Sequence, residues 1–302
     1  MPKLFYCDHH AIPLPEGHKF PLEKYRMVRE LLARDGVFEF EPAPFAEVED
    51  IRHVHDSGYV DAFLAGSLSA TAYRRIGFPA SEGLIKRTLA SVGGTIAATR
   101  LALAEGWGGN LAGGTHHAFR AEGSGFCVFN DIAIATLWAR EKAGIRRAAV
   151  IDLDVHQGDG TAEIFKDDAD VLTLSLHGKS NFPFRKQQSS IDVALEDKTS
   201  DQEYLRQLEP VLPRVAEHEP ELMFYQAGVD ALASDTLGKL ALTQEGLKQR
   251  DRLVFEFAAD SHVPLVIVQG GGYSKPIELT AQAHANVYSE AARFFARQNV
   301  AV

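Results

Sequence analysis

The stretch that decides the fold reads Ala148-Ala149-Val150-Ile151-Asp152-Leu153-Asp154-Val155-His156, and Gln157-Gly158-Asp159-Gly160 follows it. Its first half is an unbroken apolar run, which is typical of a strand buried on both faces, as in a parallel sheet. The acids and glycines after this run indicate the carboxyl end of the strand. The stretch therefore predicts the centre of an α/β fold, with polar chemistry where a buried strand ends.

The polar residues at this strand end alternate with apolar ones. Side chains along a strand point to opposite faces in turn, so Asp152, Asp154 and His156 are expected to share one face. Burying two carboxylates beside an imidazole is costly unless a cation compensates them. Mixed carboxylate and imidazole ligands suit a divalent metal ion, which makes a metal site the favoured interpretation. The alternative is that these acids cap the helix that follows.

Composition sets the limits of the function. The 302 residues carry a formal net charge of -10, and the sequence pI is about 5.6. This balance argues against nucleic acid or an anionic membrane as the main partner, and it permits a cationic substrate. Two cysteines, Cys7 and Cys127, lie far apart in the sequence, which indicates reduced thiols in a cytoplasmic protein. We expect a single domain over 1–302, without a signal peptide or a membrane span.

Strand-like and helix-like segments alternate along the chain. Strands are predicted over 4–6, 171–176, 222–230 and 263–268, and a glycine-rich strand end over 110–115. Helices are predicted over 22–33, 59–68, 83–105, 131–142, 200–215, 243–260 and 277–297. Strands separated by helices are joined by right-handed crossovers. The pattern therefore predicts a central, mostly parallel sheet with helices on both faces.

Ligands of such sheets bind beyond the carboxyl ends of the strands. The groups expected there, besides the opening stretch, are Gly113-Gly114-Thr115-His116-His117, Asp230, and Gly270-Gly271-Gly272-Tyr273. Of two adjacent histidines, one can take a proton while the other holds charge, and a tyrosine hydroxyl can donate to a developing oxyanion. Taken singly, each motif has a structural alternative: a histidine pair without chemistry, an acid capping a turn, or a flexible turn with an aromatic residue.

Together these stretches resemble the histone deacetylase family of zinc amidohydrolases, within the arginase and deacetylase superfamily. The resemblance runs from the first strand to beyond Tyr273, and the motifs are most similar to those of the class IV branch and its bacterial relatives. The motifs that carry it are His116-His117, Gly125-Phe126-Cys127-Val128-Phe129-Asn130-Asp131, Asp152 to Gly160, Ser175-Leu176-His177, Ala227 to Leu232 and Gly270 to Tyr273. The resemblance implies a three-layer arginase/deacetylase-like α/β fold.

The resemblance also implies a metal centre. Asp154, His156 and Asp230 match the zinc ligands of the family, a three-ligand site with positions left for water and a substrate carbonyl. The same ligand set suits Fe(II), so Fe²⁺ stays an alternative to Zn²⁺. Arginase-like enzymes use two manganese ions and more carboxylates, and the histidine pair with Tyr273 favours the single-metal amidohydrolase.

The implied reaction is hydrolysis of an N-acyl-lysine type of amide. His117 takes a proton from water and later protonates the leaving amine, while His116 tunes the charge beside it. Asp152 orients His116 and Asp159 orients His117, as partners that set tautomer and basicity. Tyr273 stabilises the tetrahedral oxyanion.

Further matches concern the substrate and monovalent cations. The substrate matches are Phe126 and Phe182 as tunnel walls, Gly125 through its carbonyl, and Gly271. A K⁺ or Na⁺ ion matches the group Asp152, Asp154, His156, Ser175 and Leu176. A second such site would map to Phe165, Asp168 and Val171, with Asp168 standing where a hydroxyl residue is frequent.

The substrate stays open at this point. An acyl-lysine protein or peptide, an acetylated polyamine and longer acyl chains are all compatible with the motifs. The segments after Pro79 and over 178–192 are expected to line the entrance, where Arg185 and Lys186 would not favour a basic histone tail. The hypothesis of another class is a catalytically silent fold that acts as a binding module. Its signature would be loss of a ligand, of His117 or of Tyr273, and all are present.

Overall fold

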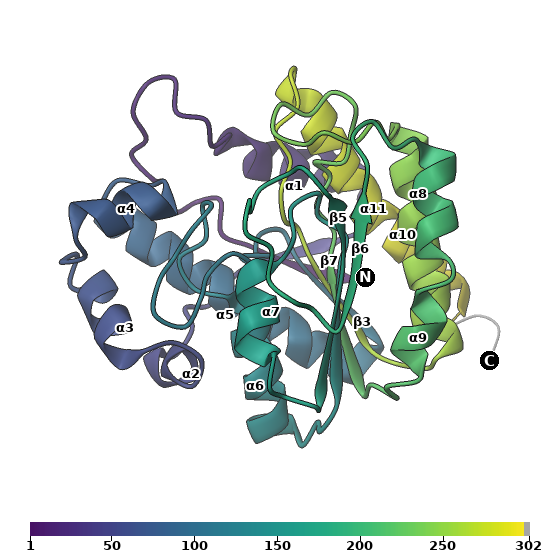
Figure 1. The fold of residues 1–302 in the computed structure, drawn as a ribbon, viewed down its shortest axis with the longest axis horizontal. Coiled ribbons are helices and arrows are strands. Elements are labelled where there is room, and N and C mark those ends of the chain that lie inside the picture. Colours follow the sequence, from purple (N-terminus) through teal and green to yellow (C-terminus); the bar gives the residue numbers. More distant parts are fainter. Residues whose placement is uncertain (299–302) are drawn as a thin grey trace.

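A computed structural model describes residues 1–298, and its centre is one eight-stranded parallel sheet with the order β2-β1-β3-β8-β7-β4-β5-β6 (Figure 1). The predicted parallel sheet is therefore confirmed. The strands are β1 Lys3–Tyr6, β2 Glu39–Pro42, β3 Trp107–Asn110, β4 Ala148–Asp152, β5 Val171–Gly178, β6 Ile191–Leu195, β7 Leu222–Gln226 and β8 Leu265–Val268.

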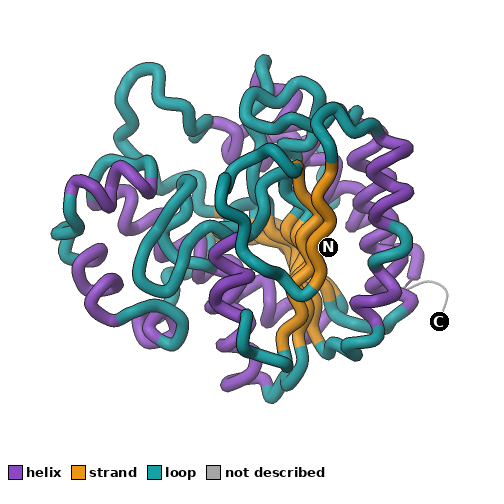
Figure 2. Tube along the Cα trace, in the orientation of Figure 1, coloured by secondary structure: helices purple, strands orange, loops and turns teal. Residues whose placement is uncertain are grey.

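Helices cover both faces of the sheet, which gives the predicted three layers. The helices are α1 Glu23–Arg34, α2 Val48–Arg52, α3 Ser57–Leu64, α4 Ala70–Ile76, α5 Glu82–Glu105, α6 Asp131–Ala143, α7 Asp159–Phe165, α8 Asp201–Leu208, α9 Leu212–Ala216, α10 Gln244–Asp260 and α11 Ile277–Gln298. Helices α8 to α11 lie on one side of the strands and α5 to α7 on the other, with the strands enclosed between them (Figures 1 and 2). Helix α1 packs on α11, and α2 packs on α6.

The core divides into two apolar clusters, one on each face of the sheet. Strand β8 shows the reason, because Leu265 and Ile267 belong to the cluster under α10 and α11, while Val266 and Val268 belong to the one under α5 and α6. Successive side chains of a strand point to opposite faces, so a strand that is apolar throughout serves both clusters. In β4, whose five residues are all buried, Ala149 and Ile151 belong to the first cluster and Val150 to the second.

The strand alternation expected after Asp152 is wrong, because β4 ends at that residue. The backbone N–H groups that follow are bonded to carboxylates. Asp154 N donates to Asp152 Oδ1 (3.1 Å), Val155 N to Asp230 Oδ1 (2.8 Å) and His156 N to Asp154 Oδ1 (3.0 Å). Asp154 and His156 therefore lie in a loop that is shaped by acids.

Other differences concern short elements. Strands β2 and β6 and helices α2, α4 and α7 are absent from the prediction, since short or half-exposed segments carry little periodic signal. The helix predicted over 200–215 is two helices, α8 and α9, because Pro210 and Pro213 lack the N–H groups that a continuous helix needs. The helix predicted over 59–68 ends at Leu64. Within residues 1–298, no helix is both long and apolar enough to cross a membrane.

Candidate active site

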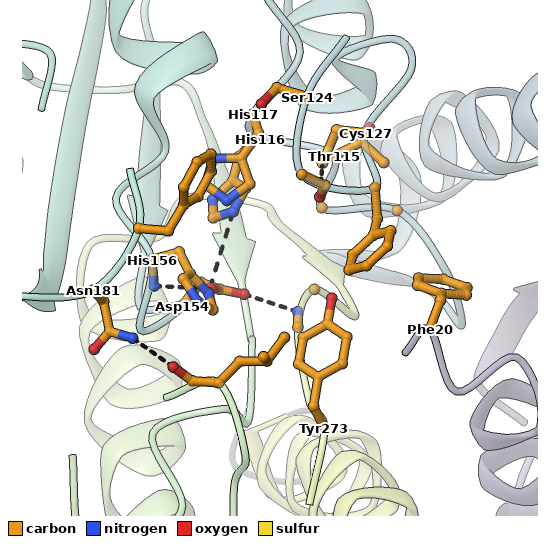
Figure 3. Close-up of a pocket in the computed structure, with 18 of the residues that line it drawn as sticks. Phe20, Thr115, His116, His117, Ser124, Cys127, Asp154, His156, Asn181 and Tyr273 are labelled. Carbon is orange, nitrogen blue, oxygen red and sulfur yellow. Dashed lines mark hydrogen bonds and ion pairs between the residues drawn. The ribbon is translucent and has the colours of Figure 1, made fainter. Parts of the chain in front are cut away.

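The polar stretches singled out in the sequence meet at one edge of the sheet. Strands β3, β8, β7 and β4 are consecutive in the sheet, and the loops after their carboxyl ends carry His116 and His117, Tyr273, Asp230, and Asp154 with His156 respectively. A cavity of about 500 Å³ opens there, lined by side chains from these loops (Figure 3). This is the place where open parallel sheets bind ligands.

Three buried side chains form a candidate metal site. Asp154, His156 and Asp230 each offer a ligand atom, and these atoms lie within 4.8 Å of one another. His156 Nδ1 is 3.0 Å from Asp154 Oδ1 and 3.0 Å from Asp230 Oδ2. Two buried carboxylates this close repel each other unless a positive charge lies between them. Two carboxylate oxygens and one imidazole nitrogen fit a divalent ion with open positions.

Protonation reflects the crowding of charge at this site. Burial opposes protonation of His156, but its hydrogen bonds with Asp154 and Asp230 outweigh burial and raise its pKa to about 10. Burial, followed by repulsion from Asp154, raises the pKa of Asp230 to about 7. The three groups attract positive charge strongly, and a divalent cation would meet the same demand as the protons.

Backbone groups hold the two carboxylates in place. Asp154 Oδ2 accepts a hydrogen bond from Gly271 N (2.8 Å), and Asp230 Oδ1 accepts one from Val155 N. A Cβ atom at Gly271 would clash with both carboxylates, and one at Gly228 would clash with Asp154. The glycines are therefore needed for backbone to approach the acids this closely.

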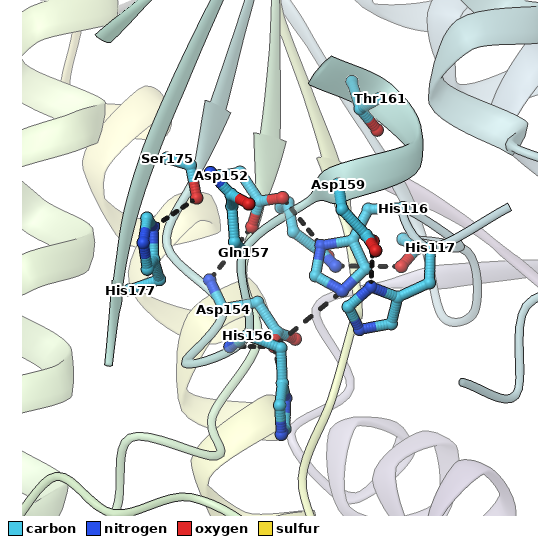
Figure 4. Close-up of polar contacts among 12 residues, drawn as sticks. His116, His117, Asp152, Asp154, His156, Gln157, Asp159, Thr161, Ser175 and His177 are labelled. Atoms are coloured by element: carbon cyan, nitrogen blue, oxygen red, sulfur yellow. Dashed lines mark hydrogen bonds and ion pairs between the residues drawn. The ribbon is translucent and has the colours of Figure 1, made fainter. Parts of the chain in front are cut away.

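Each histidine of the pair is bonded to its own carboxylate. His116 Nδ1 is 2.7 Å from Asp152 Oδ2, and His117 Nδ1 is 2.6 Å from Asp159 Oδ1 (Figure 4). The two rings lie 4.1 Å apart between centroids, and both are buried. A carboxylate at Nδ1 favours the tautomer with the proton on that nitrogen, which leaves Nε2 available.

The two histidines differ in basicity. Burial opposes the charge of His116, but the carboxylates of Asp152 and Asp154 outweigh it and raise its pKa to about 9. Burial and then the positive charge of His116 lower the pKa of His117 to about 4. A charged His116 beside a neutral His117 is the division of roles that the sequence suggested.

Tyr273 lies across the cavity from the histidines (Figure 3). Its backbone is held at both ends, because its N–H donates to Asp235 Oδ2 (2.6 Å) and its carbonyl accepts from Thr236 Oγ1 (2.8 Å). Burial raises the pKa of the Tyr273 hydroxyl well above its ordinary value. The phenol therefore stays protonated and can donate a hydrogen bond into the cavity.

Comparison with known proteins agrees with this geometry. The family model described as "Histone deacetylase domain" matches residues 18–290. The chain belongs to the histone deacetylase family. It is 44% identical over 297 residues to an uncharacterised protein of Picosynechococcus sp.. The aligned region covers 96% of this chain and 98% of that protein.

Two other relatives of this histone deacetylase-family chain have descriptive names. Histone deacetylase 2 of Arabidopsis thaliana is 34% identical over 272 residues, covering 85% of this chain and 70% of the plant protein. The histone deacetylase-like amidohydrolase of Pseudomonas aeruginosa is 31% identical over 290 residues, covering 87% and 74% respectively.

The residues expected to bind substrate line the cavity of this histone deacetylase-family chain. Phe126, Phe182, Gly125 and Gly271 are all on its wall. The Phe182 ring meets the His117 ring edge to face, with centroids 5.0 Å apart. Phe126 has a φ of 66°, and its ring lies 6.1 Å from that of Tyr273. Aromatic side chains thus border both the histidine side and the tyrosine side of the cavity.

The prediction of which segments line the cavity entrance is partly wrong. Ser180, Asn181, Phe182 and Phe184 of the segment 178–192 line the cavity, whereas Arg185, Lys186 and the segment after Pro79 do not. Little loop follows Pro79, because Ser81 accepts a hydrogen bond from Leu84 N and starts α5 at once. Arg75 and Lys239 supply the charge at the entrance instead.

The monovalent-cation sites stay predictions. At the first, Ser175 Oγ and His177 Nδ1 are 3.0 Å apart, and Asp152 is bonded to His116 (Figure 4). At the second, backbone hydrogen bonds join Asp168 N to Phe165 O and Val171 N to Asp168 O. The Asp168 carboxylate pairs with Arg140, so backbone oxygens are what this second site offers a cation.

Lys24 of α1 is a buried residue that the sequence analysis missed. Its Nζ donates to Gly270 O (3.2 Å) and Gly272 O (3.3 Å) and lies 5.1 Å from the centres of the Tyr25 and Tyr273 rings. Burial lowers its pKa to about 8. Its spacing from Val28 and Leu32 puts it in the buried stripe of α1, and a lysine in an apolar stripe is the signal that could have found it.

Proposed function

We propose that this histone deacetylase-family protein is a metal-dependent amidohydrolase that removes an acyl group from the amine of acyl-lysine or a related amine. The observation that carries the proposal is that Asp154 and His156, which form the candidate metal site with Asp230, line the same cavity as two carboxylate-bonded histidines and a buried phenol. Membership of the family supports the reaction class.

The metal is proposed to be zinc, with Fe²⁺ as the alternative, held by Asp154, His156 and Asp230. Such an ion would supply a Lewis acid that polarises the amide carbonyl and lowers the pKa of a bound water. The bonds from Gly271 N and Val155 N keep the two carboxylates oriented before the ion arrives.

His117 is proposed as the general base. Its lowered pKa leaves it neutral at pH 7, and its bond to Asp159 leaves Nε2 free to accept a proton from the attacking water. The same nitrogen then returns the proton to the leaving amine. His116, kept charged by Asp152, contributes positive charge beside the reacting carbonyl.

Tyr273 is proposed to donate its hydroxyl proton in a hydrogen bond to the oxyanion that forms when water adds to the carbonyl. Its backbone is anchored, so little ordering is needed when the substrate arrives. Phe126 and Phe182 are proposed to enclose the methylene chain of the substrate, with Gly125 and Gly271 on the wall beside it.

The proposal predicts metal-dependent hydrolysis of acyl-lysine. The zinc-loaded protein should release the fluorophore from acetyl-lysine peptides, chelation should abolish release, and added Zn²⁺ should restore it. Tyr273→Phe should lower turnover by roughly two to three powers of ten, since removal of one oxyanion donor has that effect. Matched acetyl, trifluoroacetyl and long-chain acyl peptides would then rank the acyl groups.

A result against the proposal would be unchanged turnover in Tyr273→Phe, or release of fluorophore that persists after chelation. Asp154→Asn provides the control for the metal site, because it should lose zinc affinity in a chelator competition. Loading with Fe²⁺ under anaerobic conditions separates the two candidate metals.

A further inference from the structure

The exposed charged side chains at the cavity entrance are both cationic. Of the residues that line the cavity, Asp154 belongs to the candidate metal site at the floor, and the other formally charged side chains are Arg75 and Lys239, which are exposed. No glutamate lines the cavity, and Leu237 stands on the wall beside Lys239. A substrate that extends out of the cavity therefore meets cations in a protein whose formal net charge is -10.

The two entrance cations differ in how free they are. Arg75 forms an ion pair with Glu122, which compensates its charge locally. Lys239 Nζ donates to Ser180 O (3.1 Å) and Ser180 Oγ (3.0 Å), and none of the ion pairs formed among residues 1–298 includes it. Asp197 bonds to the Ser180 hydroxyl but does not line the cavity. The charge of Lys239 is thus the one available to a substrate.

The ammonium group of Lys186 holds part of the cavity wall. Lys186 Nζ donates to Asn181 O (2.5 Å) and Pro183 O (2.7 Å), and so bonds to the segment that carries Phe182 into the cavity wall. Burial lowers the pKa of Lys186, and the charge of Lys239 lowers it further against the opposing effect of Asp159 and Asp192. Lys186 itself does not line the cavity, so it supports the wall while Lys239 carries the charge that a substrate meets.

We propose that Lys239 is a specificity-determining residue that selects acyl-lysine substrates with a carboxylate just outside the cavity and rejects acylated polyamines. The inference rests on the proposed hydrolase function and names its substrate class. The carboxylate has two chemical sources, an acidic side chain next to the acyl-lysine in a peptide or the α-carboxylate of free acyl-lysine. A polyamine instead carries an ammonium group there, which the entrance repels.

The first experiment compares acetyl-lysine peptides that differ only in the residues flanking the lysine: Glu, Gln or Lys. The zinc-loaded protein should give the highest kcat/KM for the Glu-flanked peptide, a lower value for Gln and the lowest for Lys. Each step should be roughly two- to fivefold per charge, as for partly exposed ion pairs. The differences should appear mainly in KM and shrink as salt is raised. Free acetyl-lysine against acetyl-lysinamide tests the second carboxylate source, and N-acetylputrescine tests the rejected class.

Charge reversal identifies the residue. Lys239→Glu should invert the order of the three peptides when each kcat/KM value is divided by that of the Gln-flanked peptide. Lys248→Glu is the matched control, since it makes the same change of net charge on α10, where Lys248 faces Glu245 at 3.6 Å. It should keep the original order.

The possible outcomes separate this inference from the proposed function. Hydrolysis of the Gln-flanked peptide that is strongly slowed by Tyr273→Phe, together with equal rates for all flanks, would overturn the inference alone. A preference that Lys239→Glu leaves unchanged, or N-acetylputrescine as the best substrate, would also overturn it. Failure to hydrolyse any peptide or polyamine would overturn the proposed function and this inference with it.

Discussion

Glycines stand beside the candidate metal ligands where any other residue would collide with them. Gly228 leaves no room for a Cβ atom next to the Asp154 carboxylate, and Gly271 leaves none next to Asp154 and Asp230. Gly271 also donates its N–H to Asp154. At the scale of single residues, the site therefore depends on the absence of side chains as much as on the ligands themselves.

Gly271→Ala should weaken zinc binding by about tenfold or more, the cost typical of disturbing groups that orient metal ligands. The added methyl group would force the carboxylates of Asp154 and Asp230 apart. Competition with a chromophoric chelator measures the affinity. Gly58→Ala serves as a control outside the cavity, where the new Cβ would meet Asp56 Oδ1 at 3.1 Å. Equal zinc affinity in both variants would contradict the argument.

At the scale of elements, the segment between β7 and α10 joins the metal site to the tyrosine. It carries Asp230 near its start, and Asp235 and Thr236 hold the backbone of Tyr273. Asp235 Oδ1 also accepts N–H bonds from Leu237 and Gly238, both at 2.8 Å. One carboxylate thus fixes the position of the phenol relative to the cavity wall at Leu237, although it does not itself line the cavity.

Asp235→Asn should lower kcat by roughly ten- to a hundredfold, because an amide cannot accept all these N–H bonds and Tyr273 would shift. If Asp235 acts through Tyr273, the same change made in a Tyr273→Phe background should cost almost nothing further. Steady-state kinetics of the two single variants and the double variant measure this coupling.

A loss of equal size in both backgrounds would show that Asp235 acts on the fold or on the metal site instead. Asp201→Asn is the matched control. Its carboxylate also holds a turn, accepting from Thr243 N (2.8 Å) and Thr243 Oγ1 (2.6 Å), but it does not line the cavity.

At the scale of the whole molecule, buried neutral histidines tie stability to pH. His55 lies in the core with Nδ1 2.9 Å from Phe119 O, and its Nε2 accepts a hydrogen bond from Asn130 N. Burial lowers its pKa to about 4, below the 6.5 of an unfolded chain. Between these values the unfolded chain binds more protons than the folded one, so stability falls as the pH drops from about 6.5 to about 4.

We expect the free energy of unfolding in metal-free buffer to decrease by about 2 kcal/mol from this residue between pH 7.5 and pH 5. His55→Gln should remove that share of the pH dependence, although it lowers stability at pH 7.5. Urea unfolding at the two pH values tests this, with the exposed His9→Gln as the control. A pH dependence that His55→Gln leaves intact would refute it.

The sequence by itself determined the parallel sheet, the layers of helices and most of the candidate site. An apolar strand that ends in acids is a local sequence pattern. Such a pattern predicts the structure well when the strand is buried at the centre of the sheet, as β4 is. His116, His117, Asp154, His156, Asp230 and Tyr273 all follow predicted strands, and the resemblance to the deacetylase family supplied their expected roles.

The tertiary structure alone decided which groups touch. Asp230 is distant in sequence from Asp154, and β4 ends early because the carboxylates of both acids bind backbone N–H groups that a further strand would have used. Lys24 and Asp235 act on backbone atoms of the glycine-rich loop, and Lys239 faces a cavity built by other segments. Such contacts depend on distance in space, and the spacing of residues along the chain carries no record of it.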